Sequence, residues 1–152
     1  VWSGTDVALR VIYSSALASL KDSHMEDMRL RCKRDDASVR AFMSEWMTVR
    51  LGMPRRSGKT EAMKRLISLD GLRAVVAYPT PEMAEIGPKD ISFTASNLLC
   101  HKDGIEVVFV DEAEFMDKED MDKVVQFCHP LVLRYICHGE PFVLVLLSSP
   151  SV

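Results

Sequence analysis

Apolar residues recur along the chain with two different periods, which predict helices alternating with strands. Between residues 9 and 20 the spacing is helical, and Thr5 or Asp6 can cap this first helix. The segment 21–36 is polar and dense in charge, and we interpret it as a solvated linker. Further helices are predicted over 37–45, 59–69 and 116–136, the last with a kink or break at Pro130, and a single helical turn over 82–86.

Short apolar runs between these helices predict the strands. They cover residues 46–51, 72–77, 91–94, 105–110 and 141–147. The first run alternates, which places Thr48 and Arg50 on one face, and it is less apolar than a fully buried parallel strand. Because the strands alternate with helices, we expect an α/β fold with a mainly parallel central sheet flanked by helices.

A Gly-Lys-Thr triplet stands between the first predicted strand and the helix that follows it. Such a triplet ends a P-loop, the turn that wraps nucleotide phosphates. Gly58 lets the backbone approach the phosphates, Lys59 reaches the β- and γ-phosphates, and the Thr60 hydroxyl binds Mg²⁺. The helix that follows points its positive dipole end at the same anion. We therefore expect ATP and Mg²⁺ as cofactors, bound by Ser57, Gly58, Lys59 and Thr60.

The spacing before the triplet departs from the usual pattern. A P-loop has four residues between its two glycines, whereas five separate Gly52 from Gly58. Arg55 and Arg56 lie in this irregular stretch. A guanidinium there can neutralise charge that develops on the transferred phosphoryl group. The alternative is that one or both arginines are solvated or pair with Glu61.

The strand predicted over 105–110 ends in two carboxylates, Asp111 and Glu112. An apolar strand with an acidic pair at its C-terminal tip is the Walker B pattern, in which Asp111 would hold Mg²⁺ as a hard oxygen ligand. Glu112 would orient and polarise the attacking water as a general base. Open α/β sheets bind ligands at the carboxyl ends of their strands, where both residues would lie. The alternative is that the pair only opens the next loop.

The last predicted strand ends in Ser148 and Ser149. Two hydroxyls at a strand tip beside a Walker B pair can sense the γ-phosphate and relay its loss to a moving element. The alternative is an ordinary strand exit built from turn residues.

Composition and charge exclude some classes of protein but do not identify an activity. The chain has 152 residues, of which 47% are hydrophobic and 27% charged, as in one globular domain. The net charge of −3 argues against a surface covered with nucleic acid, although the basic cluster in 29–34 could contact phosphates. No apolar run approaches the ~20 residues of a membrane span. The chain lacks an initiator Met and stops directly after a predicted strand, so we interpret it as part of a longer protein.

Three motifs together resemble the ATPase domain of viral large terminase subunits, the DNA-packaging motors of tailed phages and herpesviruses. They occupy residues 54–60, 108–115 and 148–150. The family has a variant Walker A with an arginine before Gly-Lys-Thr, an Asp-Glu-Ala Walker B followed by an aromatic residue, and a Ser/Thr-rich coupling motif after the next strand. The resemblance spans residues 51–150 and is strong at the motifs and vague between them.

The resemblance implies a P-loop NTPase fold of the RecA-like, additional-strand type. It implies one ATPase domain, with a helical lead-in over 1–44 and a P-loop core over 45–152. The family's P-loop arginine falls on Arg55, its catalytic carboxylate on Glu112, and its coupling motif on 148–150.

The resemblance also implies an activity and partners. ATP hydrolysis would drive double-stranded viral DNA into a procapsid. The expected partners are double-stranded DNA, the portal protein, the small terminase subunit and further copies of the chain in a ring, with no membrane. The location would be the interior of an infected host cell, at the procapsid portal, in the bacterial cytoplasm for a phage or the nucleus for a herpesvirus.

The chain also departs from the family. The stretch between the second predicted strand and Walker B is short, and the C-terminal nuclease domain of RNase H-like fold is absent. Since no acidic cluster replaces that domain, we expect no DNA cleavage. The candidates for an adenine contact are Trp2, Tyr13 and Trp46.

Three rival functions remain open. The leading motor domain of a DNA helicase shares Gly-Lys-Thr, an Asp-Glu box and a Ser-Ala-Thr-like third motif. A nucleotide kinase would need an acceptor-binding lid, and the adjacent Asp111 and Glu112 fit water activation better. The third rival is a nucleotide-binding module that never hydrolyses.

Overall fold

Five parallel strands form one central sheet in the part of the chain that the computed structural model describes, residues 3–100 and 104–149. Trp2, a candidate adenine contact, and Pro150, in the third motif, lie outside the described residues. The order across the sheet is β1-β5-β4-β2-β3. The strands are β1 (Thr48–Gly52), β2 (Ala74–Tyr78), β3 (Ser92–Thr94), β4 (Val107–Val110) and β5 (Val143–Ser148).

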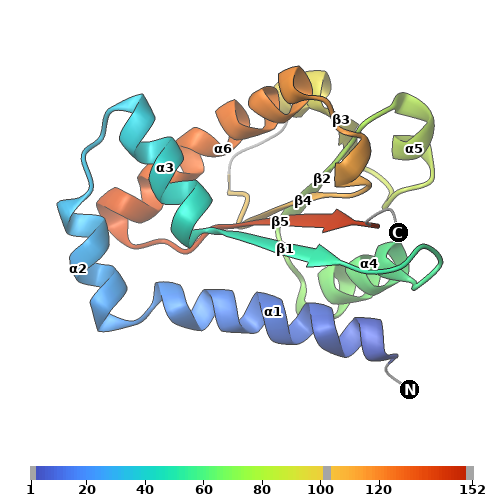
Figure 1. The fold of residues 1–152 in the computed structure, drawn as a ribbon, viewed down its shortest axis with the longest axis horizontal. Coiled ribbons are helices and arrows are strands. Elements are labelled where there is room, and N and C mark those ends of the chain that lie inside the picture. Colours follow the sequence, from blue (N-terminus) through green and yellow to red (C-terminus); the bar gives the residue numbers. More distant parts are fainter. Residues whose placement is uncertain (1–2, 101–103, 150–152) are drawn as a thin grey trace.

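Helices cover both faces of this sheet. Figure 1 shows α1 and α4 on one side of it and α3 and α6 on the other. The expected α/β fold with a parallel sheet flanked by helices is therefore confirmed. The helices are α1 (Gly4–Leu20), α2 (Ser23–Arg31), α3 (Asp36–Trp46), α4 (Lys59–Asp70), α5 (Pro81–Glu85) and α6 (Lys118–His138), with 3₁₀ turns η1 (Ala95–Cys100) and η2 (Ala113–Phe115).

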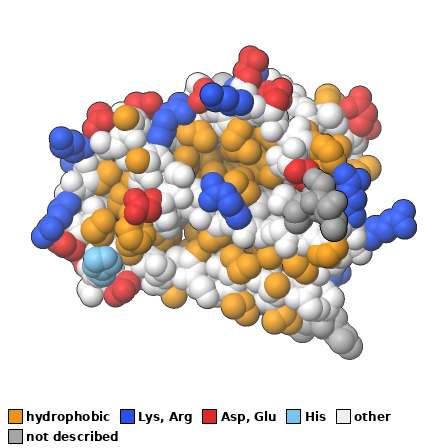
Figure 2. All heavy atoms as spheres, viewed as in Figure 1, with side chains coloured by type: hydrophobic (Ala, Val, Ile, Leu, Met, Phe, Trp, Pro, Cys, Tyr) orange, Lys and Arg blue, Asp and Glu red, His pale blue; other side chains and the backbone are white. Residues whose placement is uncertain are grey.

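The position of each strand explains its composition. Every residue of β2 and of β4 is buried, as expected for inner strands covered on both faces. β1 lies at the edge of the sheet, where Arg50 is exposed, which accounts for its weaker apolar character. Beside it on β5, Leu146 is only partly buried, and Figure 2 shows hydrophobic side chains at the centre of the face between α3 and α6.

The register places the ends of three strands side by side. Leu51 on β1 pairs with Leu147 on β5, and Val110 on β4 pairs with Leu146 on β5. Consequently, the segments that follow β1, β5 and β4 leave the sheet at one edge. These segments carry the three sequence motifs.

Three local expectations were wrong. Neither Thr5 nor Asp6 caps the first helix: Ser3 is the N-cap, and Asp6 completes a capping box with it. The expected linker over 21–36 contains α2, which the buried Met25 anchors to the core. Of the kink or break expected at Pro130, the break does not occur, because α6 continues to His138. Pro130 is exposed, and so is Gln126, whose carbonyl loses its helical partner.

Candidate functional site

A cavity of about 410 Å³ lies at the edge of the sheet where the motifs meet. Its lining consists of Arg55, Arg56, Ser57, Gly58, Lys59, Thr60, Glu61, Glu112 and Ser149. All of these except Glu61 are residues that the sequence predicts for the site. Segments far apart in the chain, after β1, β4 and β5, therefore converge on one cavity.

The loop between β1 and α4, which the sequence predicts to be a P-loop, turns sharply before α4. Gly58 is the N-cap of this helix, with a left-handed φ of 84°, which glycine adopts without steric cost. A Cβ placed on Gly58 would meet nothing within 4 Å, so the backbone here faces open space. The first N–H groups of α4 have no acceptor within the helix. The loop thus presents backbone donors to the cavity, as an anion site requires.

Lys59 contributes a buried positive charge to the lining of the first cavity. Its side chain is only 7% exposed, and its Nζ donates to the hydroxyl of Ser149. Among the described residues Lys59 forms no ion pair. The nearby Ser57 hydroxyl is also buried, with no hydrogen-bond partner in the described part of the chain. A buried ammonium and a buried donor without an acceptor favour an anionic ligand.

Thr60 and Asp111 join the P-loop to the end of β4. The Thr60 hydroxyl donates to one carboxylate oxygen of Asp111 at 2.7 Å, and the backbone N–H of Glu112 donates to the other at 3.0 Å. Asp111 is fully buried, so its orientation is fixed. These hard oxygen donors suit Mg²⁺, which commonly binds through one or two carboxylates plus phosphates and water. No group of three or more His, Cys, Asp or Glu that could hold a metal exists among the described residues.

Glu112 carries the chemistry of a candidate base. Its backbone is left-handed, with φ 56°, an uncommon conformation for a residue with a side chain. Burial raises the pKa of its carboxyl, and the neighbouring carboxylates of Asp111 and Glu114 raise that pKa further, while Lys59 and Arg55 oppose the shift. Glu112 is thus a better proton acceptor than an ordinary glutamate.

A second cavity, of about 310 Å³, adjoins the first. The two share Arg55, Thr60 and Glu112. The other lining residues are Tyr78, Met83, Ile86, Asp111 and Phe115. Asp111, which the sequence predicts for the metal, belongs to this second cavity rather than to the first.

Arg55 connects the P-loop to η2. Its guanidinium carbon lies 5.3 Å from the centroid of the Phe115 ring, a cation–π distance. Arg56 lines only the first cavity and has a left-handed φ of 63°. The alternative pairing with Glu61 is not observed, since Glu61 lies 3.4 Å from Lys64.

Ser149 connects Lys59 to Glu114 through two hydrogen bonds. The backbone N–H of Ser149 donates to Glu114 Oε2 at 2.7 Å. Ser148 lines neither cavity, and its carbonyl accepts from the Met53 N–H at 3.0 Å. The sequence pattern did not single out Glu114, because its role depends on the placement of β5 beside β4.

Helix α1, in the N-terminal segment, contacts both the loop before α4 and α4 itself. The Thr5 hydroxyl donates to the Ser57 carbonyl at 2.7 Å. Asp6, 2% exposed, pairs with Arg65 of α4 at 2.8 Å. Thr5 and Asp6, interpreted from the sequence only as caps, therefore tie α1 to the loop and to its helix.

Thr5→Val is expected to loosen this support. Valine keeps the shape of threonine but removes the hydrogen bond to Ser57, which should cost about 1 kcal/mol of the free energy of unfolding. For a domain of this size that corresponds to a fall of about 2–4 °C in Tm. Thermal unfolding checks it, with Ser14→Ala, exposed on the same helix, as the control. Equal melting temperatures for both variants and the wild type would contradict the support.

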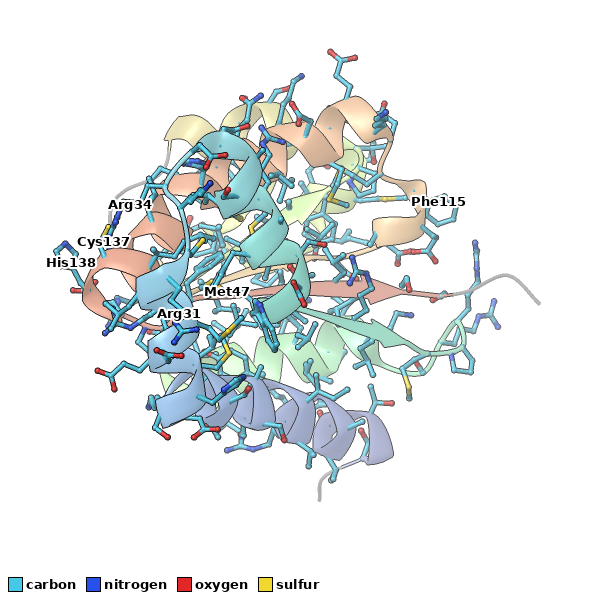
Figure 3. The ribbon with its side chains drawn as sticks, turned by 60° about the vertical axis from the view of Figure 1, so that its left-hand side comes forward. Arg31, Arg34, Met47, Phe115, Cys137 and His138 are labelled. Carbon is cyan, nitrogen blue, oxygen red and sulfur yellow. The ribbon has the colours of Figure 1, made fainter. Side chains whose placement is uncertain are left out.

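The remaining sequence candidates lie away from the two cavities. Tyr13 is 2% exposed within the core, and Trp46 lines a separate hollow between α2 and α3. Figure 3 shows Arg31 and Arg34 at the opposite end of the molecule from Phe115. Arg31 pairs with Asp27 at 3.3 Å, and Arg34 donates to the Cys137 sulfur at 3.2 Å. The basic cluster is thus remote from the site.

No protein-family model matches the chain, and no curated protein matches its sequence. A functional interpretation therefore depends on the site itself and on the motifs that form it.

Proposed function

We propose that this chain is a P-loop ATPase domain of the additional-strand type, and that its hydrolysis of ATP drives double-stranded viral DNA into a procapsid, as in large terminase subunits. The observation that carries the proposal is Lys59. Among the described residues, the buried Lys59 ammonium donates to the neutral Ser149 hydroxyl and forms no direct ion pair. Beside the turned backbone of Gly58, this ammonium suits polyphosphate better than any neutral ligand.

The sheet order supports this type of P-loop fold. β5 lies between β1, which leads into the P-loop, and β4, which leads into Asp111 and Glu112. An extra strand between those two is what the additional-strand type requires. The Lys59 contact to Ser149, directly after that extra strand, and the Ser149 contact to Glu114 link the three motifs in space.

The residues present fit a division of labour in hydrolysis. Gly58 and Lys59 would hold the phosphates, and Thr60 with Asp111 would hold Mg²⁺, which neutralises charge on the β- and γ-phosphates when bound. Glu112 would accept the proton of the attacking water. Arg55, at the junction of the two cavities, would approach the transferred phosphoryl group, and Arg56 would add charge from the loop.

The chain of contacts from Lys59 suggests how hydrolysis is coupled to movement. Lys59 donates to Ser149, and Ser149 donates to Glu114. When phosphate competes for Lys59, Ser149 loses that partner, and η2 can respond through Glu114. Coupling of this kind suits a motor more than a static nucleotide-binding module.

The experiment is phosphate release from ATP by the full-length protein that contains this chain, with and without double-stranded DNA. We expect Mg²⁺-dependent phosphate release that DNA stimulates, and DNA uptake by procapsids that carry portal protein and small terminase subunit. Phosphate transfer to a small acceptor without phosphate release would support a nucleotide kinase instead. Strand separation of a duplex would support a helicase, and ATP binding without turnover would support a non-hydrolysing module.

The remaining expectations follow from the same proposal. A packaging motor would act as a ring of copies at the procapsid portal inside the infected cell. In the described part of the chain, no helix is both long and apolar enough to cross a membrane.

A further inference from the structure

Tyr78, the last residue of β2, carries a buried hydroxyl that nothing in the proposed mechanism has used. Its side chain is 2% exposed, and its hydroxyl meets no partner at full hydrogen-bond geometry among the described residues. Burial raises the pKa of Tyr78, and the Asp111 side chain nevertheless lies close enough for a hydrogen bond with the phenol that raises this pKa further, so the O–H is directed to that carboxylate. The lone pairs of the Tyr78 oxygen remain without a donor, and because Tyr78 lines the second cavity, we expect that donor from the cavity.

The register of the sheet places Tyr78 beside the acidic pair. Ala77 on β2 pairs with Val110 on β4, so the next residues, Tyr78 and Asp111, follow the same pairing at the strand ends. Thr60, Asp111 and Glu112 line the same cavity as Tyr78. A water there would find several polar partners, as an ordered buried water needs. Met83, Ile86 and Phe115 add apolar lining, and the last two of these side chains are themselves exposed.

Gly87 fixes the tip of the Tyr78 ring. A Cβ on Gly87 would lie 2.6 Å from the Tyr78 hydroxyl oxygen and 2.5 Å from Ser92 Oγ, distances that real contacts do not show. Glycine is therefore required here by space and not by its backbone, since Gly87 is not among the glycines with positive φ. Ser92 already donates to the Pro88 carbonyl at 2.6 Å. The phenol is thus held in place against the loop.

We propose that Tyr78 is a positioning residue for ATP hydrolysis: its phenol oxygen holds the attacking water in the second cavity beside Glu112. The inference depends on the proposed ATPase function and names the place from which water attacks. The water gives one hydrogen bond to Glu112 and the other to the Tyr78 oxygen, which leaves its lone pairs free.

The balance of the step is simple. The water oxygen bonds to the γ-phosphorus, the bond from that phosphorus to the bridging oxygen of ADP breaks, and Glu112 takes the proton. Tyr78 keeps its own proton throughout. Burial, the charge of the Asp111 carboxylate and a hydrogen bond to it, and the charge of Glu112 raise the pKa of the phenol, which keeps it neutral.

The second cavity is also large enough for more than one water, since liquid water occupies about 30 Å³ per molecule. A small acceptor molecule in this cavity would make the protein a kinase. The adjacent acidic pair favours water as the occupant, and the experiment below distinguishes the two.

The test is Tyr78→Phe in the full-length protein, compared with Tyr13→Phe. Tyr13 has an equally buried hydroxyl without a partner among the described residues, and it lines neither cavity. For Tyr78→Phe we expect turnover of ATP to fall about 10–100-fold, the effect of one lost hydrogen bond to a reacting group. The affinity for a non-hydrolysable ATP analogue should stay within about twofold. Tyr13→Phe should change neither value.

A second readout separates positioning from packing. Retention of ADP with aluminium fluoride, which mimics the transferred phosphoryl group with its axial water, should fall in Tyr78→Phe by a factor like that of turnover. The melting temperature without nucleotide should fall by no more than about 2–4 °C, because the phenol has at most the Asp111 carboxylate as a partner. Gly87→Ala, which displaces the ring tip, should reproduce the loss of turnover.

The outcomes are distinguishable. Wild-type turnover and aluminium fluoride retention in Tyr78→Phe overturn this inference and leave the ATPase proposal intact. A wild-type protein that binds ATP without turnover overturns both. Loss of analogue binding together with a larger fall in melting temperature assigns Tyr78 to packing, and phosphate transfer to an acceptor assigns the cavity to that acceptor.

Discussion

Glu112→Gln is expected to reduce ATP turnover by about 10²–10⁴-fold, while ATP still binds. Glutamine has nearly the shape of glutamate but cannot accept the proton of the attacking water. The P-loop contacts of Lys59 and Thr60 do not involve the Glu112 side chain, so affinity for ATP should remain. The measurements are phosphate release and equilibrium binding of a fluorescent ATP analogue.

The same substitution is expected to raise stability at neutral pH. Burial and the carboxylates of Asp111 and Glu114 raise the pKa of Glu112 above the ordinary value of 4.5. Between 4.5 and the raised value, the folded protein retains a proton that the unfolded chain has lost. Glu112 therefore makes the free energy of unfolding decrease as pH rises through that window.

Two pH profiles check this sign. The difference in melting temperature, Glu112→Gln minus wild type, should increase as pH rises above 4.5 and level off above the raised pKa. Turnover of the wild type should increase over the same window, because only the deprotonated carboxylate acts as a base. A stability difference that shrinks as pH rises would contradict the assigned direction.

Glu119→Gln is the matched control. Glu119 is exposed near the start of α6, and it lines neither of the two site cavities. The same loss of a carboxylate there should leave turnover unchanged and alter stability by less than about 0.5 kcal/mol. Unchanged turnover in Glu112→Gln would remove Glu112 from the role of base, and loss of ATP binding would assign it to the nucleotide pocket instead.

Elements with strong local patterns could be predicted from the sequence. β2 and β4 are uninterrupted apolar runs, and this local pattern is enough to predict each strand and the helices that flank it in the sequence. α2 could not be predicted in this way, because it buries only Met25 within a highly charged segment. Its stability comes from tertiary contacts, such as the hydrogen bond from Arg29 to the Ile136 carbonyl at 3.1 Å.

The candidate site divides in the same way. Lys59, Thr60, Asp111 and Glu112 could be found from the sequence because each belongs to a contiguous motif. Tyr78, Glu114 and Thr5 could not. Their partners lie on other elements, and the insertion of β5 between β1 and β4 is a long-range pairing that no local pattern encodes. Positive φ at Arg56 and Glu112 is likewise a property of the folded chain.

Lys59→Met is expected to weaken ATP binding by about 100-fold while raising the stability of the nucleotide-free protein. A charge-assisted hydrogen bond to phosphate contributes about 1.5–3 kcal/mol, and each 1.4 kcal/mol is about tenfold in affinity. Without nucleotide, the ammonium is buried against a neutral hydroxyl. Methionine fills a similar volume without that desolvation cost, so the free energy of unfolding should rise by about 1 kcal/mol or more.

Lower ATP affinity together with higher stability distinguishes this result from misfolding, because a variant that misfolds loses affinity and stability together. Lys123→Met is the control, since Lys123 lies on α6 and pairs with Asp120 at 3.7 Å, outside both cavities. Losing this half-exposed pair and the hydrogen bond from Lys123 to Ser96 at 3.1 Å should leave ATP affinity unchanged and lower the free energy of unfolding by about 1 kcal/mol. If Lys59→Met kept wild-type affinity for ATP, the cavity would not be an anion site. If Lys59→Met bound ATP poorly and also melted at a lower temperature, the role of Lys59 would be structural, through its hydrogen bond to Ser149.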